Sequence, residues 1–255
     1  MLAALLLSTL VRSQDLGDCD ALNDTCTTGQ TNQLHDEFLK QRIKLQEVIF
    51  REYTPAIPPF YTLYSLNNGN ESLPSMFTVN IELSMLKLVS VSEPEEKVTV
   101  IFDYLMTWQD IRLRWNPAQY GGIEYIYIGL SSIWVPPVAT VDAHDVVDYR
   151  QGEQKVAFIN YNGSVGTYMA TVTSVVCAMD IYKFPLDEQT CSVSLMDHLF
   201  RNAEYQITTS MTYLPRPLSM LGNGEWEMKR IWRREENITD DDGVFVTNIA
   251  CLTTR

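Results

Sequence analysis

The sequence lacks long apolar runs and has few basic residues. After Ser13 no stretch approaches the ~18 apolar residues that a membrane-spanning helix needs, so this chain alone is not expected to form a channel. Lysine and arginine number 19 against 32 aspartates and glutamates, which gives a formal net charge of −13. This balance excludes nucleic acid as the expected partner, because phosphate binding needs a basic face. It suits a surface that attracts cations, although a solvated acidic surface is the commoner cause.

The motifs of common enzymes are also missing. The sequence holds only three histidines, with no pair at metal-ligand spacing, and it has no Gly-x-Ser-x-Gly nucleophile elbow. Four titratable residues do cluster in one short stretch: Asp142, His144, Asp145 and Asp148. Such spacings could hold a divalent ion, but we expect a solvated surface loop there. The sequence therefore predicts no enzyme, no metal site and no cofactor.

The N-terminal part indicates a secreted chain. Residues 1–13 are expected to be a signal peptide, because Met1 to Val11 is almost wholly apolar and Ser13 is an acceptable small residue before a cleavage site. Residues 14–30 are polar and irregular, and we expect a flexible segment there. Four Asn-x-Ser/Thr sequons fit the same extracellular location and are expected glycosylation sites: Asn23, Asn70, Asn162 and Asn237.

Five cysteines leave one without a partner inside the chain. Cys177 and Cys191 enclose thirteen residues, and in a secreted chain this pair predicts a disulfide. In the loop-entropy description it would stabilise the fold by roughly 3 kcal/mol. Cys19 and Cys26 are near enough in sequence to close a small N-terminal loop, which would leave Cys251 as a free, buried residue of the last strand. The alternative is that an N-terminal cysteine reaches a neighbouring subunit.

The hydrophobic pattern changes from helical to extended along the chain. Residues 31–53 have apolar residues at helical spacing, and the proline-rich residues 54–59 end this pattern. Alternation with a period of two follows over residues 77–85 and 98–108, with a turn at 93–96 between them. Further short alternating segments lie at 123–128, 156–159, 168–176, 226–232 and 244–252. This arrangement predicts an all-β, immunoglobulin-like β-sandwich with an N-terminal α-helix, as one domain over residues 31–255.

The segment between Cys177 and Cys191 carries a more specific pattern. Phe184-Pro185 lies near its centre, where an aromatic-proline pair has a raised chance of a cis peptide bond, and Asp187 follows. Together with Asp180, this pattern resembles the signature loop of the Cys-loop pentameric ligand-gated ion channels, which include the nicotinic, glycine, GABA and 5-HT3 receptors. Leu186 departs from the family, which usually has an aromatic or large apolar residue there.

Other motifs extend the resemblance from about Thr31 to Arg255. Three segments resemble the family's second strand, the approach to its first ligand-binding loop and the start of the hairpin that caps the binding site: Trp108-Gln-Asp110, Ile133-Trp134-Val-Pro136 and Asn223-Gly224-Glu225-Trp226. The resemblance implies the extracellular ligand-binding domain of a divergent subunit. It also implies a homo- or heteropentamer with a small-molecule ligand between adjacent subunits, and membrane helices that this chain does not contain.

The resemblance places the family's ligand cage on unexpected residues. In the nicotinic branch, aromatic side chains hold a cationic amine by cation–π attraction. The first-loop position falls on Val141, the second-loop position on His198 with Phe200 two residues further on, and one complementary-face position on Asp103. Tyr168 falls where the complementary face usually contributes contacts. This loss of the aromatic cage argues against transmitter binding of the acetylcholine type at this subunit's own interfaces.

Two interpretations of the replacing residues stay open. In the first, Asp103, His198 and the acidic residues 235–242 form a polar site that is pH-sensitive or attracts cations. In the second, His198 is a satisfied polar residue and residues 235–242 are a solvated hairpin tip with a glycan at Asn237.

For the whole protein, the resemblance implies a ligand-driven closure of the hairpin at 232–244. The turn at 92–97 and the loop 177–191, with Phe184, Pro185 and Asp187, would pass this movement to the membrane helices. The alternative is a secreted soluble binding protein of the acetylcholine-binding-protein type. A third hypothesis is a non-binding subunit that only completes heteromers. The expected location is the extracellular side of the plasma membrane, or outside the cell.

Overall fold

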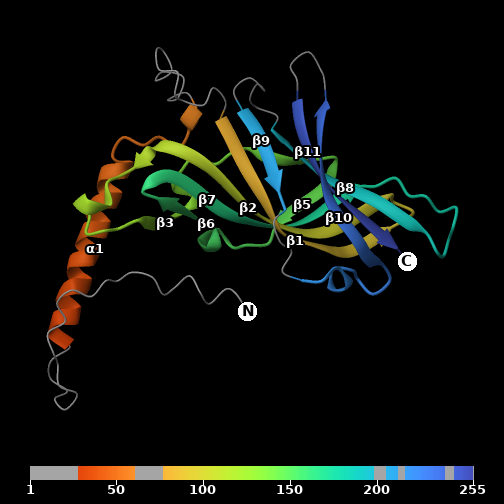
Figure 1. Cartoon of the computed structure of the whole chain (residues 1–255), viewed down its shortest axis with the longest axis horizontal. Helices are drawn as coiled ribbons and strands as arrows, with labels where there is room; N and C mark the ends of the chain where they lie inside the picture. Colours follow the sequence, from red (N-terminus) through yellow and green to blue (C-terminus); the bar gives the residue numbers. More distant parts are fainter. Residues whose placement is uncertain (1–27, 61–76, 198–204, 212–215, 239–243, 255) are drawn as a thin grey trace.

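The computed structural model describes residues 28–60, 77–197, 205–211, 216–238 and 244–254. A helix, α1 (Thr28–Phe50), lies at one end of an elongated β-sandwich, and the last strand, β11 (Val244–Thr254), ends towards the opposite end (Figure 1). Helix α1 begins inside the segment that we expected to be flexible, and it ends at Phe50, five residues before Pro55. Among the described residues, no helix is long and apolar enough to cross a membrane.

The larger layer is a seven-stranded sheet, called sheet A here. Its strands run in the order β3-β6-β7-β2-β1-β9, and β5 also pairs with β7. Their bounds are β1 Phe77–Ser92, β2 Lys97–Arg114, β3 Tyr125–Gly129, β5 Ala143–Asp148, β6 Val156–Asn160, β7 Asn162–Val176 and β9 Tyr205–Ser210. All these pairings are antiparallel except β1 with β9, which is parallel.

The smaller layer, sheet B, has four strands in the order β10-β11-β8-β4. Its other strands are β4 Val138–Val141, β8 Glu188–Asp197 and β10 Glu227–Ile238. In the connections that the structure describes lie the short 3-10 helices η1 Pro117–Gln119, η2 Leu130–Ser132, η3 Gly152–Gln154 and η4 Leu218–Met220. Two packed sheets with an N-terminal helix confirm the predicted all-β sandwich.

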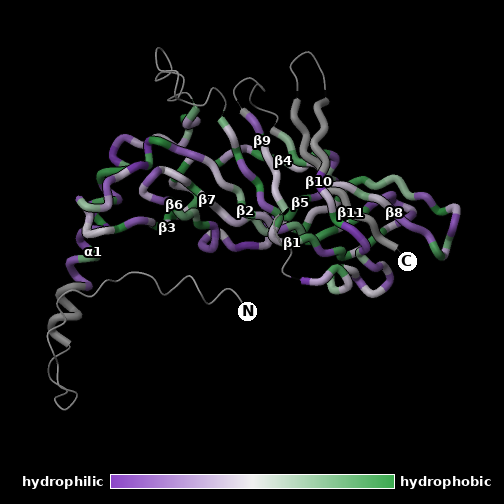
Figure 2. Tube along the Cα trace, in the orientation of Figure 1, coloured by the Kyte–Doolittle hydropathy of each residue, from purple (hydrophilic) through white to green (hydrophobic). Residues whose placement is uncertain are grey.

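The two sheets pack through side chains that are buried at every second position of their strands. In β2 every second residue from Val98 to Asp110 is buried, as the period-two pattern predicts, and apolar and polar residues interleave along the long strands in Figure 2. In β1 a register shift between Leu83 and Met85 changes the phase. Leu86 is therefore fully buried and Met85 only partly, so the alternation that we expected over residues 77–85 holds as far as Leu83 and then shifts by one residue.

Some strands were not expected from the sequence. Residues 142–148, which we expected to be a solvated surface loop, contain β5, whose backbone pairs with β7. The side chains of β5 are mostly exposed, so its sequence lacks the alternation of apolar and polar residues that marks a half-buried strand. Strands β4, β8 and β9 were missed too. Strand β8 pairs with β11 on one side and with β4 on the other, so it attaches Val141 of β4 to sheet B.

Candidate functional site

The structure separates the candidate ligand-binding residues between the two sheets. Asp103 lies on β2 and Tyr168 on β7, both in sheet A. Val141 is the last residue of β4 in sheet B, where it is half-buried opposite Ser194 of β8. His198 and Phe200 lie outside the described residues. One copy of the chain therefore brings Asp103 and Tyr168 onto one face and leaves Val141 on the other layer.

The register of sheet A explains why Asp103 and Tyr168 are neighbours. Leu105 of β2 is opposite Tyr168, and Asp103 is opposite Ala170 of β7. Residues directly opposite share a face of the sheet, and this face is the one turned away from the core. Tyr168 is 59% exposed there. The two candidates thus belong to one open surface.

A tyrosine that the sequence analysis missed covers Asp103. The Tyr149 hydroxyl donates to both carboxylate oxygens of Asp103, at 2.8 Å to Oδ1 and 2.9 Å to Oδ2. The backbone N–H of Tyr149 donates to the Ala170 carbonyl at 3.3 Å, which places Tyr149 over β7. Partial burial raises the pKa of Asp103, while the bond from Tyr149 acts in the lowering direction. Burial, and then the bond to Asp103, raises the pKa of Tyr149 to about 12.

An ion-pair cluster fixes the backbone on either side of Tyr149. Asp148 accepts from Arg150 three times: Oδ1 from the backbone N–H at 3.0 Å and from Nε at 3.1 Å, and Oδ2 from Nη2 at 3.0 Å. Lys155 Nζ lies 3.0 Å from Asp148 Oδ2. The hydrogen bonds from Arg150 hold the pKa of Asp148 well below its usual range. Arg150 Nη1 also donates to the Tyr168 carbonyl, so one cluster positions both tyrosines.

A second cluster of the same kind lies beside the end of α1. Asp110, on the core side of β2, is fully buried. It accepts from Arg112 at 3.1 Å (backbone N–H to Oδ1), 2.9 Å (Nε to Oδ1) and 2.7 Å (Nη2 to Oδ2). The Tyr53 hydroxyl donates to Asp110 Oδ2 at 2.9 Å and accepts from the Trp134 N–H at 3.0 Å. Burial raises the pKa of Tyr53 well above its usual range.

This buried cluster positions the approach to β4. Trp134 precedes β4 by four residues, and its N–H bond to Tyr53 ties that segment to the chain that leaves α1. The Arg112 guanidinium also lies over the Tyr53 ring, with Cζ 4.5 Å from the ring centroid. Val141 is therefore attached, through β4, to a segment that is fixed to both β2 and α1.

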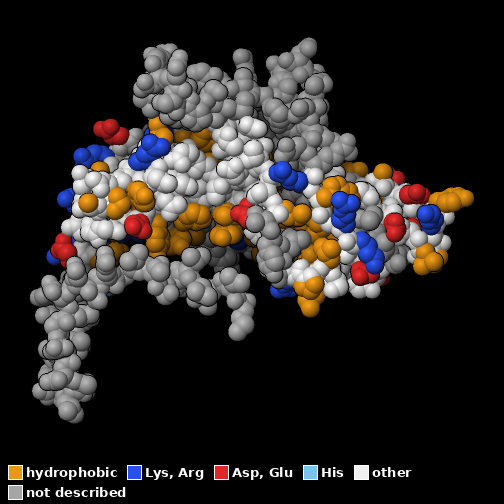
Figure 3. Space-filling model, viewed as in Figure 1, with side chains coloured by type: hydrophobic (Ala, Val, Ile, Leu, Met, Phe, Trp, Pro, Cys, Tyr) orange, Lys and Arg blue, Asp and Glu red, His pale blue; other side chains and the backbone are white. Residues whose placement is uncertain are grey.

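The expected coupling loop has a fixed base and an exposed apolar tip. Cys177 and Cys191 form a disulfide, and the Phe184-Pro185 peptide bond is cis. Buried Gln189 donates from Nε2 to Asp187 Oδ2 at 2.7 Å and to the Asp180 carbonyl at 2.8 Å. The exposed residues of the tip are Ile181, Tyr182, Phe184 and Leu186, with Tyr182 91% exposed. Apolar side chains appear at this extreme of the molecule in Figure 3.

The turn between β1 and β2 contacts the base of this loop. The Cys177 N–H donates to the Glu96 carbonyl at 2.7 Å. Glu96 has a φ of 46°, in the left-handed region that non-glycine residues rarely adopt, and it lies at the end of the tight turn at 93–96. The two segments that were expected to act together are thus joined by a backbone hydrogen bond.

Among the predicted glycosylation sites, Asn162 is exposed at the start of β7, and its Oδ1 accepts from the Ser164 N–H at 3.0 Å. Asn237 lies on β10, opposite Phe245 of β11. Asn23 and Asn70 lie outside the described residues, as do Cys19 and Cys26. Cys251 is on β11, in register with Cys191 of β8. Glycosylation at the four asparagines stays a prediction.

The sequence did contain a signal for the two clusters. Both are built on the tripeptide Asp-x-Arg: Asp110-Ile-Arg112 and Asp148-Tyr-Arg150. Tyr53 is 57 residues from Asp110, and Tyr149 is 46 residues from Asp103. Spacing along the chain alone could not have paired these tyrosines with these aspartates. In the described ranges, no group of three or more His, Cys, Asp or Glu side chains is arranged to hold a metal ion.

Comparison with known proteins relates this fold to one family. The family described as "Neurotransmitter-gated ion-channel ligand binding domain" matches residues 43–249. The neuronal acetylcholine receptor subunit alpha-5 of Rattus norvegicus is 28% identical over 170 residues, 67% of this chain and 37% of that protein. The neuronal acetylcholine receptor subunit non-alpha-3 of Carassius auratus is 29% identical over 180 residues, 71% of this chain and 36% of that protein.

A relative from another receptor group is similar at the same level. The 5-hydroxytryptamine receptor 3A of Cavia porcellus is 29% identical over 156 residues, 59% of this chain and 31% of that protein. This chain therefore spans about a third of the length of the curated relatives that it matches. The expected kinship with this group of receptors is confirmed.

Proposed function

This chain belongs to the neurotransmitter-gated ion-channel ligand-binding domain family, and from that premise we propose that it binds a small ligand between adjacent subunits of a pentameric channel. Binding would gate a pore that is formed by segments outside this chain. The observation that carries the proposal is the split of the candidate residues. Asp103 and Tyr168 occupy the open face of sheet A, whereas Val141 belongs to sheet B.

A head-to-tail ring would unite the two halves. In such a ring each subunit presents one surface to the next subunit and a different surface to the previous one. Asp103, Tyr149 and Tyr168 would supply the complementary half of a site, and the segment around Val141 the principal half. His198 and Phe200 are proposed for the principal half as well, because they follow β8, which pairs with β4.

We propose a cationic ligand, which favours the cation-seeking interpretation of Asp103. On the open face, the Asp103 carboxylate accepts from the neutral phenol of Tyr149 and from the backbone at Thr171. No ion pair among the described residues includes Asp103: the Arg150 guanidinium acts on its charge from nearby but is paired with Asp148. An ammonium group would neutralise Asp103, and Tyr149 and Tyr168 would provide aromatic surface beside it. This site differs from an all-aromatic cage by recognising charge through a carboxylate.

The other parts of the chain fit this role as proposals. Residues 1–13 are a signal peptide, residues 14–30 a lead-in segment and residues 31–255 the domain. The domain lies on the extracellular side of the plasma membrane, with other subunits of a homo- or heteropentamer as partners. Phe184, Pro185 and Asp187 belong to the loop that passes the movement on. Its exposed apolar tip and its bond to the 93–96 turn support that role.

The test uses the secreted, purified chain. Light scattering would give its assembly state, and thermal shift against a set of small amines would find a stabilising compound. Asp103→Asn should then weaken the binding of that amine about tenfold. Asp145→Asn is the matched control, because it removes one exposed carboxylate from β5 on the same sheet. Equal affinity for the wild type and the Asp103 variant would contradict the proposed site.

The alternative function is a secreted soluble binding protein of the same fold. It predicts the same ring and the same dependence on Asp103, but no membrane-anchored form. Sequencing the full transcript separates the two, because a reading frame that continues into four apolar segments excludes the soluble protein. A monomer that no amine stabilises would instead favour a subunit that only completes heteromers.

A further inference from the structure

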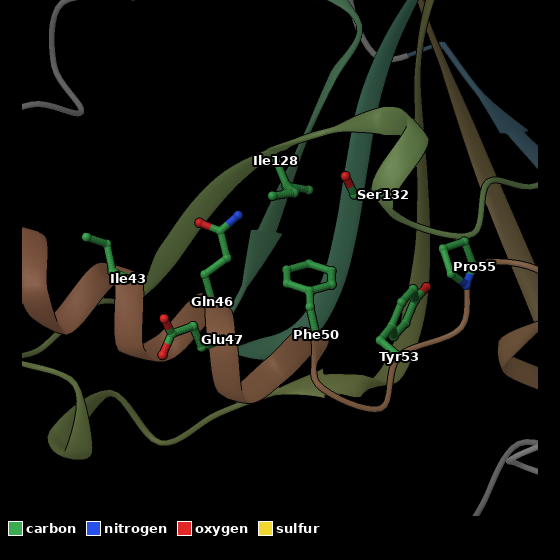
Figure 4. A pocket seen from close by; sticks show the side chains of 8 residues that line it. All are labelled: Ile43, Gln46, Glu47, Phe50, Tyr53, Pro55, Ile128 and Ser132. Carbon is green, nitrogen blue, oxygen red and sulfur yellow. The ribbon is translucent and has the colours of Figure 1, made fainter.

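A cavity of about 500 Å³ lies between α1 and the consecutive elements β3 and η2 (Figure 4). This volume is in the range of small-molecule sites in proteins, which is about 300–1,000 Å³. Ile128 and Ser132 form the wall opposite the helix. None of the residues that line it belongs to the site proposed at Asp103. The cavity is therefore a separate feature at the far end of the domain from the coupling loop.

One face of α1 forms the floor of this cavity. Ile43, Gln46, Glu47 and Phe50 follow each other at steps of three, one and three residues, which places them on one side of a helix. Leu45, on the other side, is fully buried in the core. The helix thus packs with one face and presents a second face, which mixes apolar, amide and carboxylate groups, to the cavity.

The aromatic groups of the cavity are held in place. Figure 4 shows Phe50 standing between Gln46 and Tyr53, and Gln46 extending from the helix towards Ile128. The Phe50 and Tyr53 rings meet edge to face, with centroids 5.6 Å apart. The Tyr53 hydroxyl is already bound to Asp110 and Trp134, so Tyr53 offers the cavity its ring. Two ring surfaces are available to an occupant without rearrangement.

The carboxylate of the cavity has no cation. No ion pair of the described residues includes Glu47, and its carboxylate accepts none of their side-chain hydrogen bonds. Arg42 Nη2 donates to the Tyr127 carbonyl at 2.8 Å, and Arg112 is bound to Asp110. Lys44 and Arg51, three residues before and four residues after Glu47, form no ion pair with it. Glu47 is exposed, so it can meet a charged group without a large desolvation cost.

We propose that this cavity is a second binding site for a small organic cation with an aromatic or alkyl body. The ammonium group lies at Glu47 and donates to its carboxylate, with the Gln46 amide as a further acceptor. The apolar body lies against Phe50 and Ile128. A carboxylate at the mouth, two rings and an aliphatic wall fit an amine of the arylalkyl class better than an anion or a sugar.

The experiment measures binding of 2-phenylethylamine to the full secreted chain by calorimetry and saturation-transfer NMR, with 2-phenylethanol as the uncharged probe. The amine is expected to bind more tightly than the alcohol. Glu47→Gln should weaken amine binding about threefold to tenfold and leave alcohol binding unchanged, in line with a partly exposed ion pair beside aromatic rings. Glu52→Gln, at an exposed carboxylate two residues beyond the end of α1, is the matched control and should have no effect.

Two further variants separate this site from the interface site. Phe50→Leu keeps an apolar side chain at the helix end and should weaken both probes, because both use the ring. Asp103→Asn should leave this binding unchanged. The proposal is overturned if Glu47→Gln and Glu52→Gln behave alike, if the alcohol binds as tightly as the amine, or if Asp103→Asn abolishes the signal.

Discussion

The two Asp-x-Arg clusters of this domain have the same local geometry and different surroundings. In each, the aspartate accepts from the backbone N–H and Nε of the arginine two residues later through one oxygen, and from Nη2 through the other. At the first, the side chains of Asp110 and Arg112 are 0% and 18% exposed. At the second, those of Asp148 and Arg150 are 21% and 11% exposed.

The difference lies in what each cluster is bound to. Asp110 is surrounded by core residues and receives Tyr53, which fixes the end of α1 and the Trp134 segment. Asp148 is at the edge of sheet A, and its cluster holds Tyr149 over Asp103 on an open surface. Removing one member of a buried ion pair leaves an unpaired charge, whereas an exposed pair is screened by solvent. The same motif therefore stabilises the core at one place, and at the other it holds Tyr149 and Tyr168 on the open face where we propose a ligand site.

The largest expected effect is that of Asp110→Asn. The amide cannot balance the Arg112 guanidinium, so the folded state should lose about 3–5 kcal/mol of unfolding free energy. Urea unfolding of the secreted chain measures the loss. Asp148→Asn makes the same chemical change at the open cluster, and equal losses for the two variants would erase the contrast between them.

Tyr53→Phe should have the next largest effect. It removes the acceptor of the Trp134 N–H and the donor to Asp110, which should reduce the unfolding free energy by about 1–3 kcal/mol. Tyr149→Phe is the matching change on the open face, because it removes the hydroxyl that donates to Asp103. Its cost should stay near or below about 1 kcal/mol, and a ranking in the opposite order would contradict the structural role of Tyr53.

Asp148→Asn should act mainly through pH. The folded-state pKa of Asp148 lies below its ordinary value of 3.8, so its contribution to stability is present above that pH and is lost as pH falls below it. At pH 7 the variant should lose about 1 kcal/mol or less, because the pair is partly exposed. Unfolding measured from pH 7 down to about pH 2 should show a shallower acid limb in the variant. An unchanged acid limb would mean that Asp148 is not stabilised in its charged form.

The smallest effect on stability should come from the Asp103–Tyr149 contact, where the expected change is in proton affinity. Burial raises the pKa of Asp103, and the bond from Tyr149 opposes this rise. Tyr149→Phe should therefore move the pKa of the Asp103 carboxyl further upward, which a carbon-13 NMR titration can measure. Tyr161→Phe, at an exposed tyrosine in the turn between β6 and β7, is the control and should leave this pKa unchanged.

The long strands and the helix could be predicted because their burial follows one period. Every second residue of β2 from Val98 to Asp110 is buried, so hydrophobicity alone reveals the strand. Strand β5 has mostly exposed side chains and exists because β7 offers it a backbone edge. Its existence depends on a partner about 25 residues away rather than on its own composition. The loop between Cys177 and Cys191 was found because its residues form a contiguous motif.

The candidate site was predicted only in part, for a related reason. Asp103 and Tyr168 came from matching positions of a family pattern, and the register brings them onto one face. Tyr149 became part of the site only when Asp148 was paired with Thr171, which places the next residue above Ala170 and Asp103. A register is a property of two strands together, and a reading of one segment cannot supply it.

The parallel pairing of β1 with β9 has a consequence for biosynthesis. Asn80 and Thr208, which are partners in this pairing, are 128 residues apart in the chain. At 5–20 residues per second, roughly 6–25 s of translation separate the emergence of the two strands. During that interval β1 has β2 on one side and an unpaired backbone edge on the other, and such an edge can pair with another chain. The nascent chain therefore exposes an unpaired strand edge for a limited time, and the yield of folded protein should depend on what covers β1 until β9 is made.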